Sequence, residues 1–283
     1  MHICVITDNA TSHSSKRFLK EARFNNIEMT FVPWKDVFLN KAGVLLCAKM
    51  PLKNFDALIL RSSVTSLTPS ILVVEYCKYY NIRLLNEKFY FRYQTVNKLR
   101  QQIIFQMEKI PCLKIFYGEN VSFSFLRKEL GLPFIAKLAT GSLGKQVFKI
   151  SSKKEFESFF RQQKADKQLC LFQKFYRIDA DYRVFIVGKR VFGPVKRIAP
   201  KGEWKTNARG AKHERAEKQE RVLALAMSIA KKTGIEFAGV DILIDSANKP
   251  RVIEINTMAD FRVFDEVYPE INIAKKTISL LEL

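Results

Sequence analysis

The sequence predicts a mixed α/β protein that begins with a parallel sheet and continues with antiparallel strands. Four short aliphatic runs near the N-terminus are separated by helix-like segments: ICVIT (3–7), IEMTFV (27–32), ALILRSS (57–63) and IRLLN (82–86). Strands that alternate with helices are typical of parallel sheets, because the chain must cross over before it returns to the same edge. The later run over 181–199 instead turns at Gly188-Lys189, which predicts an antiparallel hairpin.

The composition is that of a globular chain. Its 283 residues are 47% hydrophobic and 27% charged, which suits one large domain or two to three smaller ones. No apolar run approaches the roughly 20 residues that a membrane-spanning helix needs, and the start, MHICVITDNA, lacks the basic and apolar regions of a secretory signal. Five scattered cysteines without a CxxC pair argue against a disulfide framework or a structural zinc site. We therefore expect a cytoplasmic protein with no membrane partner.

The formal net charge of +20 is the one unusual bulk property. It has three explanations: nucleic-acid binding, an acidic or phosphate-rich partner, or the solubility bias of a lysine-rich proteome. The 23 phenylalanines lie in apolar segments and are not interleaved with Lys and Arg as base-stacking platforms. This pattern favours a partner other than nucleic acid.

Further segments can be assigned along the chain. The stretch 88–109 is expected to be helical, and 201–214 is polar and weakly patterned, which predicts a loop. An amphipathic helix follows and ends at Gly234, a residue type suited to a helix C-cap. Arg61 and the two serines after it fall at the carboxyl end of a predicted strand, where open α/β sheets usually bind ligands, although a plain loop explains them equally well.

Near the C-terminus, the stretch GVDILIDSANKPRVIEIN (239–256) predicts a hairpin that carries acidic residues. Alternation along the second arm places Val252, Glu254 and Asn256 on one face. If the turn is centred between residues 247 and 248, Asp241 lies directly opposite Glu254. Two carboxylates and an amide oxygen are then expected within a few ångströms of one another.

Carboxylates at such a distance raise each other's pKa or require a cation. Hard oxygen ligands in this number suit Mg²⁺, which one or two carboxylates hold together with substrate phosphates. Two alternatives stay open from this stretch alone. One is an exposed sheet face with incidental acids, and the other is a hairpin that forms ion pairs with the basic loop.

The order of seven motifs resembles the ATP-grasp superfamily and, within it, the RimK-like carboxylate–amine ligases. The resemblance covers essentially the whole chain and rests on FDALILR, LLNEKFYFRYQTVNKLRQ, PFIAKLATGSLGKQV, LFQKFYRIDADYRVFIVG, KTNARG, GVDIL and EIN. It implies an N-terminal α/β domain (1–95), a central ATP-grasp subdomain (96–176) and a C-terminal subdomain with a metal site (177–283), the last two clasping ATP.

The resemblance also implies which residues bind the nucleotide. Two lysines would hold the α- and β-phosphates, a glycine-rich loop would close over the phosphates, and a hinge would receive adenine through backbone groups. Asp181 would position ribose or a lysine, and Arg183 completes the same D-x-R motif. At Lys174 the family usually has an acidic residue. The corresponding positions are Lys98 and Lys137; Gly141, Ser142 and Gly144; and Lys174, Phe175 and Tyr176.

The remaining matches concern the metal and the reaction. Asp241, Glu254 and Asn256 match the Mg²⁺ (or Mn²⁺) ligands. Three further residues match the groups around the acceptor carboxylate and its acyl phosphate, where arginine suits planar oxyanions: Arg197, Asn207 and Arg209. After Asn256 the chain reads TMADFR, whereas RimK itself continues with a proline–glycine turn, so acceptor and amine specificity are not transferred.

The implied activity is ATP-dependent joining of an amino acid to a carboxylate of an acidic peptide, protein or carrier, with release of ADP and phosphate. Two alternatives are a ligase that acts on a small-molecule or cofactor acceptor, and a non-catalytic nucleic-acid-binding protein. Relatives of this family often self-associate, so a homo-oligomer is an alternative to a monomer.

Overall fold

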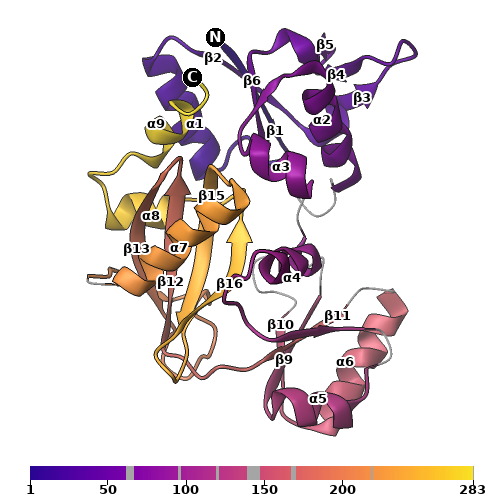
Figure 1. Ribbon diagram of the computed structural model, residues 1–283, viewed down its shortest axis with the longest axis vertical. Coiled ribbons are helices and arrows are strands. Elements are labelled where there is room, and N and C mark those ends of the chain that lie inside the picture. The colour runs from indigo at the N-terminus through magenta and orange to yellow at the C-terminus, as the bar shows by residue number, and fades with distance from the viewer. Residues whose placement is uncertain are drawn as a thin grey trace.

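The computed structural model describes residues 1–61, 67–94, 97–118, 121–138, 147–166, 170–217 and 219–282, without the side chains of residues 67 and 163–166. This part of the chain forms one parallel sheet and three antiparallel sheets, with helices packed against them (Figure 1). The predicted mixed α/β class is therefore confirmed. The domain boundaries at 95/96 and 176/177 stay predictions.

The parallel sheet has the strand order β2-β1-β6-β7. Its order reverses at β1, because the chain passes to β2 on one side and later to β6 on the other; Thr7 and Arg61 are paired at the carboxyl ends of β1 and β6. The elements of this region are β1 (His2–Thr7), α1 (His13–Phe24), β2 (Glu28–Val32), β6 (Ala57–Arg61), α2 (Leu67–Tyr80) and β7 (Arg83–Leu84).

Two features of the first hundred residues differ from expectation. The helical segment predicted over 88–109 is two helices, α3 (Glu87–Tyr93) and α4 (Lys98–Met107). The break comes after α3 because Gln94 has a φ of 56°, which no helix accommodates. A small antiparallel sheet with two 3₁₀ turns was not predicted at all: η1 (Trp34–Asp36), β3 (Val37–Leu39), β4 (Leu45–Cys47), β5 (Met50–Pro51) and η2 (Leu52–Asn54).

A second antiparallel sheet, with the order β10-β9-β11-β8, packs two helices against a phenylalanine-rich core. Phe172 at its centre stacks on Phe160 with ring centroids 5.8 Å apart, and meets Phe134 edge to face. The elements are β8 (Ile115–Tyr117), α5 (Phe123–Leu130), β9 (Phe134–Leu138), β10 (Val147–Ile150), α6 (Lys153–Asp166) and β11 (Cys170–Lys174).

The largest sheet is antiparallel, with the order β14-β13-β12-β15-β16. The predicted hairpin at Gly188-Lys189 and the helix end at Gly234, which has a φ of 71°, are confirmed. The stretch predicted as a loop over 201–214 is wrong at its end, where β14 begins. The elements are β12 (Ala180–Val187), β13 (Arg190–Ile198), β14 (Lys212–Arg215), α7 (Glu220–Thr233), β15 (Phe237–Ile244), β16 (Pro250–Asn256), α8 (Arg262–Val267) and α9 (Ile273–Ile278).

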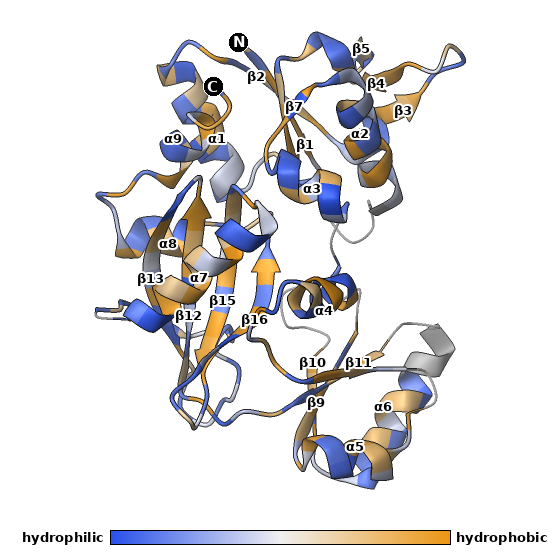
Figure 2. Ribbon diagram, in the orientation of Figure 1, coloured by the Kyte–Doolittle hydropathy of each residue, from blue (hydrophilic) through white to orange (hydrophobic). Residues whose placement is uncertain are grey.

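The parallel sheet and the largest sheet share their hydrophobic cores. One cluster joins Leu58 of β6 to Val184 and Val240 of the large sheet, and a second joins Phe18 of α1 to Phe185 of β12. Figure 2 shows the hydrophobic residues that run along β12 and β15 into these cores. Because both clusters cross between the sheets, the two sheets are held as one packed unit.

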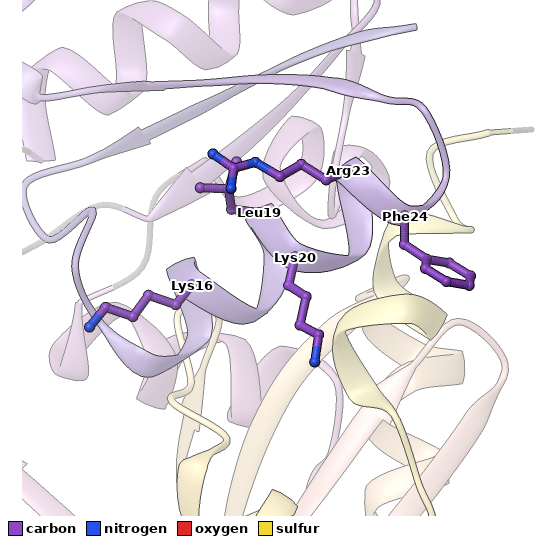
Figure 3. Close-up of a pocket in the computed structure, with 5 residues that line it drawn as sticks. All are labelled: Lys16, Leu19, Lys20, Arg23 and Phe24. Carbon is purple, nitrogen blue, oxygen red and sulfur yellow. The ribbon is translucent and has the colours of Figure 1, made fainter.

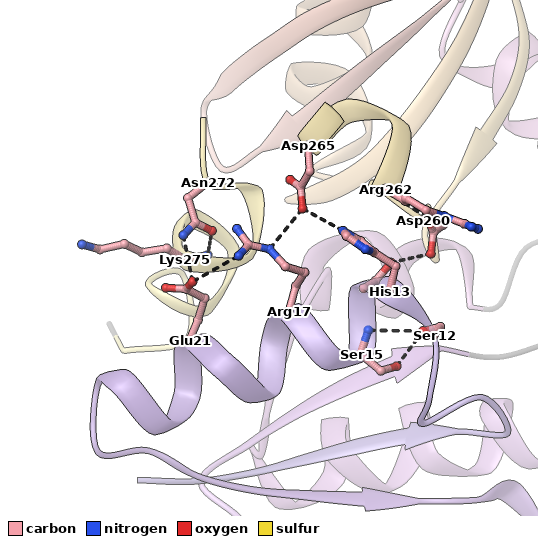
Figure 4. A network of polar contacts seen from close by, with 11 residues as sticks. Ser12, His13, Ser15, Arg17, Glu21, Asp260, Arg262, Asp265, Asn272 and Lys275 are labelled. Carbon is pink, nitrogen blue, oxygen red and sulfur yellow. Dashed lines mark hydrogen bonds and ion pairs between the residues drawn. The ribbon is translucent and has the colours of Figure 1, made fainter. Parts of the chain in front are cut away.

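Polar contacts reinforce the same junction on its surface (Figure 4). The carboxylate of Asp265 in α8 accepts from His13 at 2.8 Å and lies 3.1 Å from Nε of Arg17, both in α1. Asn272, at the start of α9, donates to Glu21 at 2.9 Å. The first helix of the chain is thus fixed to its last two helices. Among the described helices, none is both long and apolar enough to cross a bilayer.

Candidate active site

The acidic hairpin forms as predicted at its central pair but not throughout. Asp241 and Glu254 are direct cross-strand partners, which confirms that expectation. Closer to the turn, Ile242 pairs with Val252, so Ile253 is an extra residue in β16 and forms a β-bulge. Val252 consequently packs in the core with Ile255. The prediction that Val252 shares a face with Glu254 is wrong, because strict alternation does not continue through a bulge.

A buried ladder of charges lies on neighbouring strands of the large sheet. Arg183 donates to both oxygens of Asp241, at 2.6 and 2.7 Å, and Arg197 lies 3.0 Å from the same carboxylate. Arg197 also donates to both oxygens of Asp181, at 2.6 and 2.7 Å, and Thr206 donates to Asp181 at 2.7 Å. Asp181, Arg197 and Asp241 are each at most 9% exposed.

Mutual attraction keeps this ladder charged. Burial by itself raises the pKa of Asp241, but Arg183 and Arg197 outweigh it and hold that pKa below its usual value. Burial likewise lowers the pKa of Arg197, but Asp241 and Asp181 raise it overall. Asp181 is bound by Arg197 and Thr206, and its assignment to ribose or to positioning a lysine stays a prediction.

Two lysines stand in a different environment. Lys137 lies in β9, is 8% exposed, and donates to the side-chain oxygen of Gln173 in the adjacent strand at 2.6 Å. Burial lowers the pKa of Lys137 to about 8, with Glu254 opposing the shift and Lys98 adding to it. Burial also lowers the pKa of Lys98, at the start of α4, again with Glu254 opposing. The structure therefore brings Lys98, Lys137 and Glu254 together.

Gln101 explains how α4 comes to lie beside the hairpin. Its amide donates to the carbonyl of Ile255 at 2.8 Å, and its side-chain oxygen accepts from the N–H of Ile255 at 2.9 Å. The side chain thus replaces a neighbouring strand at the edge of β16 and places Lys98, one helical turn earlier, near Glu254. This contact was not predicted, since no sequence pattern marks a glutamine that pairs with a distant backbone.

The donor set fits a metal nucleotide better than a bare metal ion. Within the described residues, no group of three or more His, Cys, Asp or Glu side chains could hold a metal. Glu254 supplies one carboxylate, and Asp241 supplies another whose oxygens are already held by Arg183 and Arg197. Asn256 supplies an amide oxygen that already accepts from the N–H of Met258 at 2.8 Å. Mg²⁺ held by so few protein groups completes its shell with phosphates and water. Moreover, the site has one more cation than it has carboxylates. Its four cations are Lys98, Lys137, Arg183 and Arg197, and its three carboxylates are Asp181, Asp241 and Glu254.

Comparison with known proteins identifies the family. Residues 95–281, well over half of the chain, match the family model of the RimK-like ATP-grasp domain. The chain belongs to the RimK-like ATP-grasp family. A probable alpha-L-glutamate ligase of Legionella pneumophila (strain Philadelphia 1) is 27% identical over 291 residues, covering 100% of this chain and 95% of that protein.

Solved structures agree in fold. A RimK domain ATP-grasp protein from Sphaerobacter thermophilus matches with a TM-score of 0.76 at 15% identity, with 100% of both chains covered. The ATP-grasp ligase PsnB, complexed with a phosphomimetic variant of its minimal precursor, Mg and ADP, matches with a TM-score of 0.74 at 17% identity, covering 99% of this chain and 97% of that one. With the family match and the ligase relatives, the RimK-like protein is an ATP-grasp ligase, an enzyme class that forms carbon–nitrogen bonds.

The hinge of this RimK-like ligase joins the lysine-bearing sheet to the charge ladder. Lys174 ends β11, is exposed, and its ammonium lies 5.6 Å from the ring centroid of Tyr176. Phe175 meets Trp204 edge to face at 5.9 Å. Lys174, Phe175 and Tyr176 lie where the chain leaves β11 toward β12, and their assignment to adenine binding stays a prediction.

The acceptor-side residues predicted for the RimK-like ligase lie in two environments. Asn207 and Arg209 are exposed in the loop before β14, whereas Arg197 is buried between two carboxylates. Thr206, the residue before Asn207, donates to Asp181, which Arg197 also binds, so the loop meets the ladder at this point. The assignment of Arg197, Asn207 and Arg209 to the acceptor stays a prediction. The predicted phosphate loop, Gly141, Ser142 and Gly144, lies outside the described residues.

A basic cavity of about 570 Å³ lies elsewhere, on the exposed face of α1 (Figure 3). Its lining combines three cations with two hydrophobic side chains, and Phe24 is 81% exposed. The lining residues are Lys16, Leu19, Lys20, Arg23 and Phe24. None of them belongs to the site around Glu254.

Proposed function

We propose that the protein adds an amino acid, with L-glutamate as the first candidate, to a carboxylate of an acidic peptide, protein or carrier acceptor at the expense of ATP. The observation that carries this proposal is the convergence of Lys98 and Lys137 on Glu254, directly opposite Asp241. The relatives named probable alpha-L-glutamate ligases support the donor, and neighbours complexed with precursor peptides support a peptide acceptor.

The roles of the residues follow from their charges. Lys98 and Lys137 would bind the phosphates of ATP, and Asp241, Glu254 and Asn256 would hold Mg²⁺ (or Mn²⁺), which supplies charge neutralisation at the transferred phosphoryl group. The acceptor carboxylate attacks the γ-phosphorus, the bond to ADP breaks, and an acyl phosphate forms. The amine then attacks the acyl carbon, and phosphate leaves. Arg209 and Asn207, both exposed, are candidates for binding the acceptor.

Removal of one metal carboxylate tests this assignment. The protein is incubated with MgATP, L-glutamate and a glutamate-terminated peptide, and ADP release and peptide mass are followed. We expect Glu254→Gln to lower turnover by more than about a hundredfold, since even outer-shell partners of a metal contribute 10- to 100-fold. Unfolding by denaturant serves as the fold control. A variant that ligates at the wild-type rate would show that Glu254 holds no essential metal.

The basic charge around the loop before β14 favours an acidic acceptor. Between Lys196 and Arg221 the sequence has nine Lys or Arg against four Glu. Such a surface steers anionic partners at low ionic strength. We expect the rate with an acidic acceptor at low concentration to fall as salt rises from 50 to 300 mM, and the rate with an uncharged acceptor to change little. Steep salt-dependent binding of DNA or RNA without ATP turnover would instead support the non-catalytic alternative.

A further inference from the structure

A second polar site lies where the parallel sheet meets the end of the acidic hairpin. Arg61 is the last residue of β6, and its Nη2 donates to the carbonyl of Met258 at 3.4 Å. Met258 is in turn bound to Asn256 through its N–H. The guanidinium of Arg61 is therefore tied to the segment that immediately follows the predicted metal ligands. Its place is also the carboxyl edge of a parallel sheet at the point where the strand order reverses, the usual ligand position in such sheets.

Arg61 differs from Arg183 and Arg197 of the ladder, each of which is paired with a carboxylate. Within the described part of the chain it forms no ion pair with a carboxylate. Burial lowers the pKa of Arg61, and Asp260 and Tyr90 offset this only in part. Asp260 is engaged elsewhere, because it accepts from Ser14 at 3.0 Å and from the N–H of Arg262 at 2.9 Å. A partly buried guanidinium that, among the described residues, donates one long hydrogen bond to a carbonyl is suited to an incoming anion.

Tyr90 provides a second, independent observation. It lies in α3, is 2% exposed, and its hydroxyl has no hydrogen-bond partner among the described residues. Burial raises the pKa of Tyr90, whereas Thr257, Asn86 and Arg61 each act to lower it, so the hydroxyl lies near Arg61 and the segment after β16. A buried hydroxyl without a partner costs stability unless a ligand completes it.

We propose that Arg61 and Tyr90 form a carboxylate-binding subsite that holds a non-reacting carboxylate of a substrate beside the phosphate-transfer site. This inference rests on the proposed ligase function for the identity of its ligand. The carboxylate belongs either to the amino-acid donor or to the acidic acceptor. Both present the same chemistry to a guanidinium and a phenol, and binding measurements distinguish them.

The test measures binding to the full chain in the presence of MgADP by calorimetry. The probes are L-glutamate and its two monoamides, L-glutamine and L-isoglutamine, and tetraglutamate with a free or amidated C-terminus. We expect Arg61→Met to weaken L-glutamate or tetraglutamate by about 10- to 100-fold, the range for a charge-assisted hydrogen bond, and to remove the preference of that ligand over its amide. If L-glutamate loses affinity, the bound carboxylate belongs to the amino-acid donor. If tetraglutamate loses affinity, it belongs to the acceptor. Arg23→Met, which changes an exposed arginine of α1, is the matched control.

Tyr90→Phe separates binding from folding. If the hydroxyl serves only the fold, its removal changes Tm without altering ligand affinity. The subsite predicts an unchanged or raised Tm of the ligand-free protein together with weaker binding of the same ligand that Arg61→Met affects. MgADP affinity should stay within twofold of wild type in both variants.

Two results would overturn the subsite: wild-type protein that binds none of the probes, or Arg61→Met protein that binds all of them as wild type does. These outcomes differ from failure of the proposed function. A protein that binds glutamate through Arg61 but forms no ligated product retains the subsite and loses the ligase proposal. If the wild-type protein ligates normally but Arg61→Met leaves every affinity unchanged, the ligase proposal stands and the subsite is wrong.

Discussion

Two kinds of cation in the candidate active site differ in how the protein balances their charge. Arg197 lies between Asp181 and Asp241, and these carboxylates raise its pKa despite burial. Lys137 is as deeply buried, but it donates to the neutral amide of Gln173, and burial lowers its pKa to about 8. The charge of Arg197 is balanced within the protein, whereas we propose that the charge of Lys137 is balanced by a bound ligand. Charge in this site thus has a structural component and a binding component that separate experiments can isolate.

The largest expected effect comes from removing one carboxylate of the charge ladder. Asp241→Asn leaves the buried Arg197 and the half-buried Arg183 without their shared charge partner, so we expect the unfolding free energy to fall by about 3–5 kcal/mol. Urea denaturation at pH 7 measures the change. Glu270→Gln is the control, because it breaks an exposed, solvent-screened ion pair with Arg215 and should leave stability almost unchanged. Equal losses in both variants would contradict the distinction between buried and exposed pairs.

Lys137 should behave in the opposite way. Because its pKa is lower in the folded protein than the ordinary 10.5, the folded state binds fewer protons between pH 8 and 10.5, and stability rises with pH across that window. The gain amounts to about 3 kcal/mol, and it should vanish in Lys137→Met. The difference between the two proteins in unfolding free energy, measured from pH 7 to 10.5, isolates this residue from other titrating groups.

Nucleotide binding gives the same variant a second measurement. We expect Lys137→Met to weaken MgADP by at least about tenfold, and wild-type affinity to fall as pH rises above about 8 and the ammonium loses its proton. Lys128→Met, an exposed lysine of α5, is the control. Unchanged MgADP affinity in Lys137→Met would remove Lys137 from the phosphate site.

The smallest expected effect concerns one hydrogen bond at the end of the ladder. Thr206→Val removes the 2.7 Å bond to Asp181 but keeps the shape of the side chain and both bonds from Arg197. We expect a loss of about 1 kcal/mol, because the carboxylate stays paired. The neighbouring Asn207→Ala, at an exposed position, should change unfolding free energy by less than about 0.5 kcal/mol.

Local pattern predicted much of this architecture and one central pair of the site. Alternation and turn residues were sufficient for the parallel strands, for the hairpin at Gly188-Lys189 and for Asp241 opposite Glu254. The ladder was not predicted, because Arg183 meets Asp241 only through the register of β12 against β15, two segments far apart in sequence. The helix break after Tyr93 and the role of Gln101 likewise depend on tertiary contacts that leave no periodic signal. The resemblance supplied the family, and the structure supplied the partners of each charge.

The β-bulge at Ile253 changes the direction of β16 without changing which side chains β16 pairs with β15. If Ile253 were deleted, Val252 would still face Ile242, Glu254 would still face Asp241, and the arm would alternate without interruption. Every proposed metal ligand and every cross-strand partner would be kept, yet the added bend and twist of a bulged strand would be lost. Selection or a protein engineer can therefore redirect Glu254 and Asn256 relative to α4 by adding or removing one residue, without replacing any group that touches a substrate.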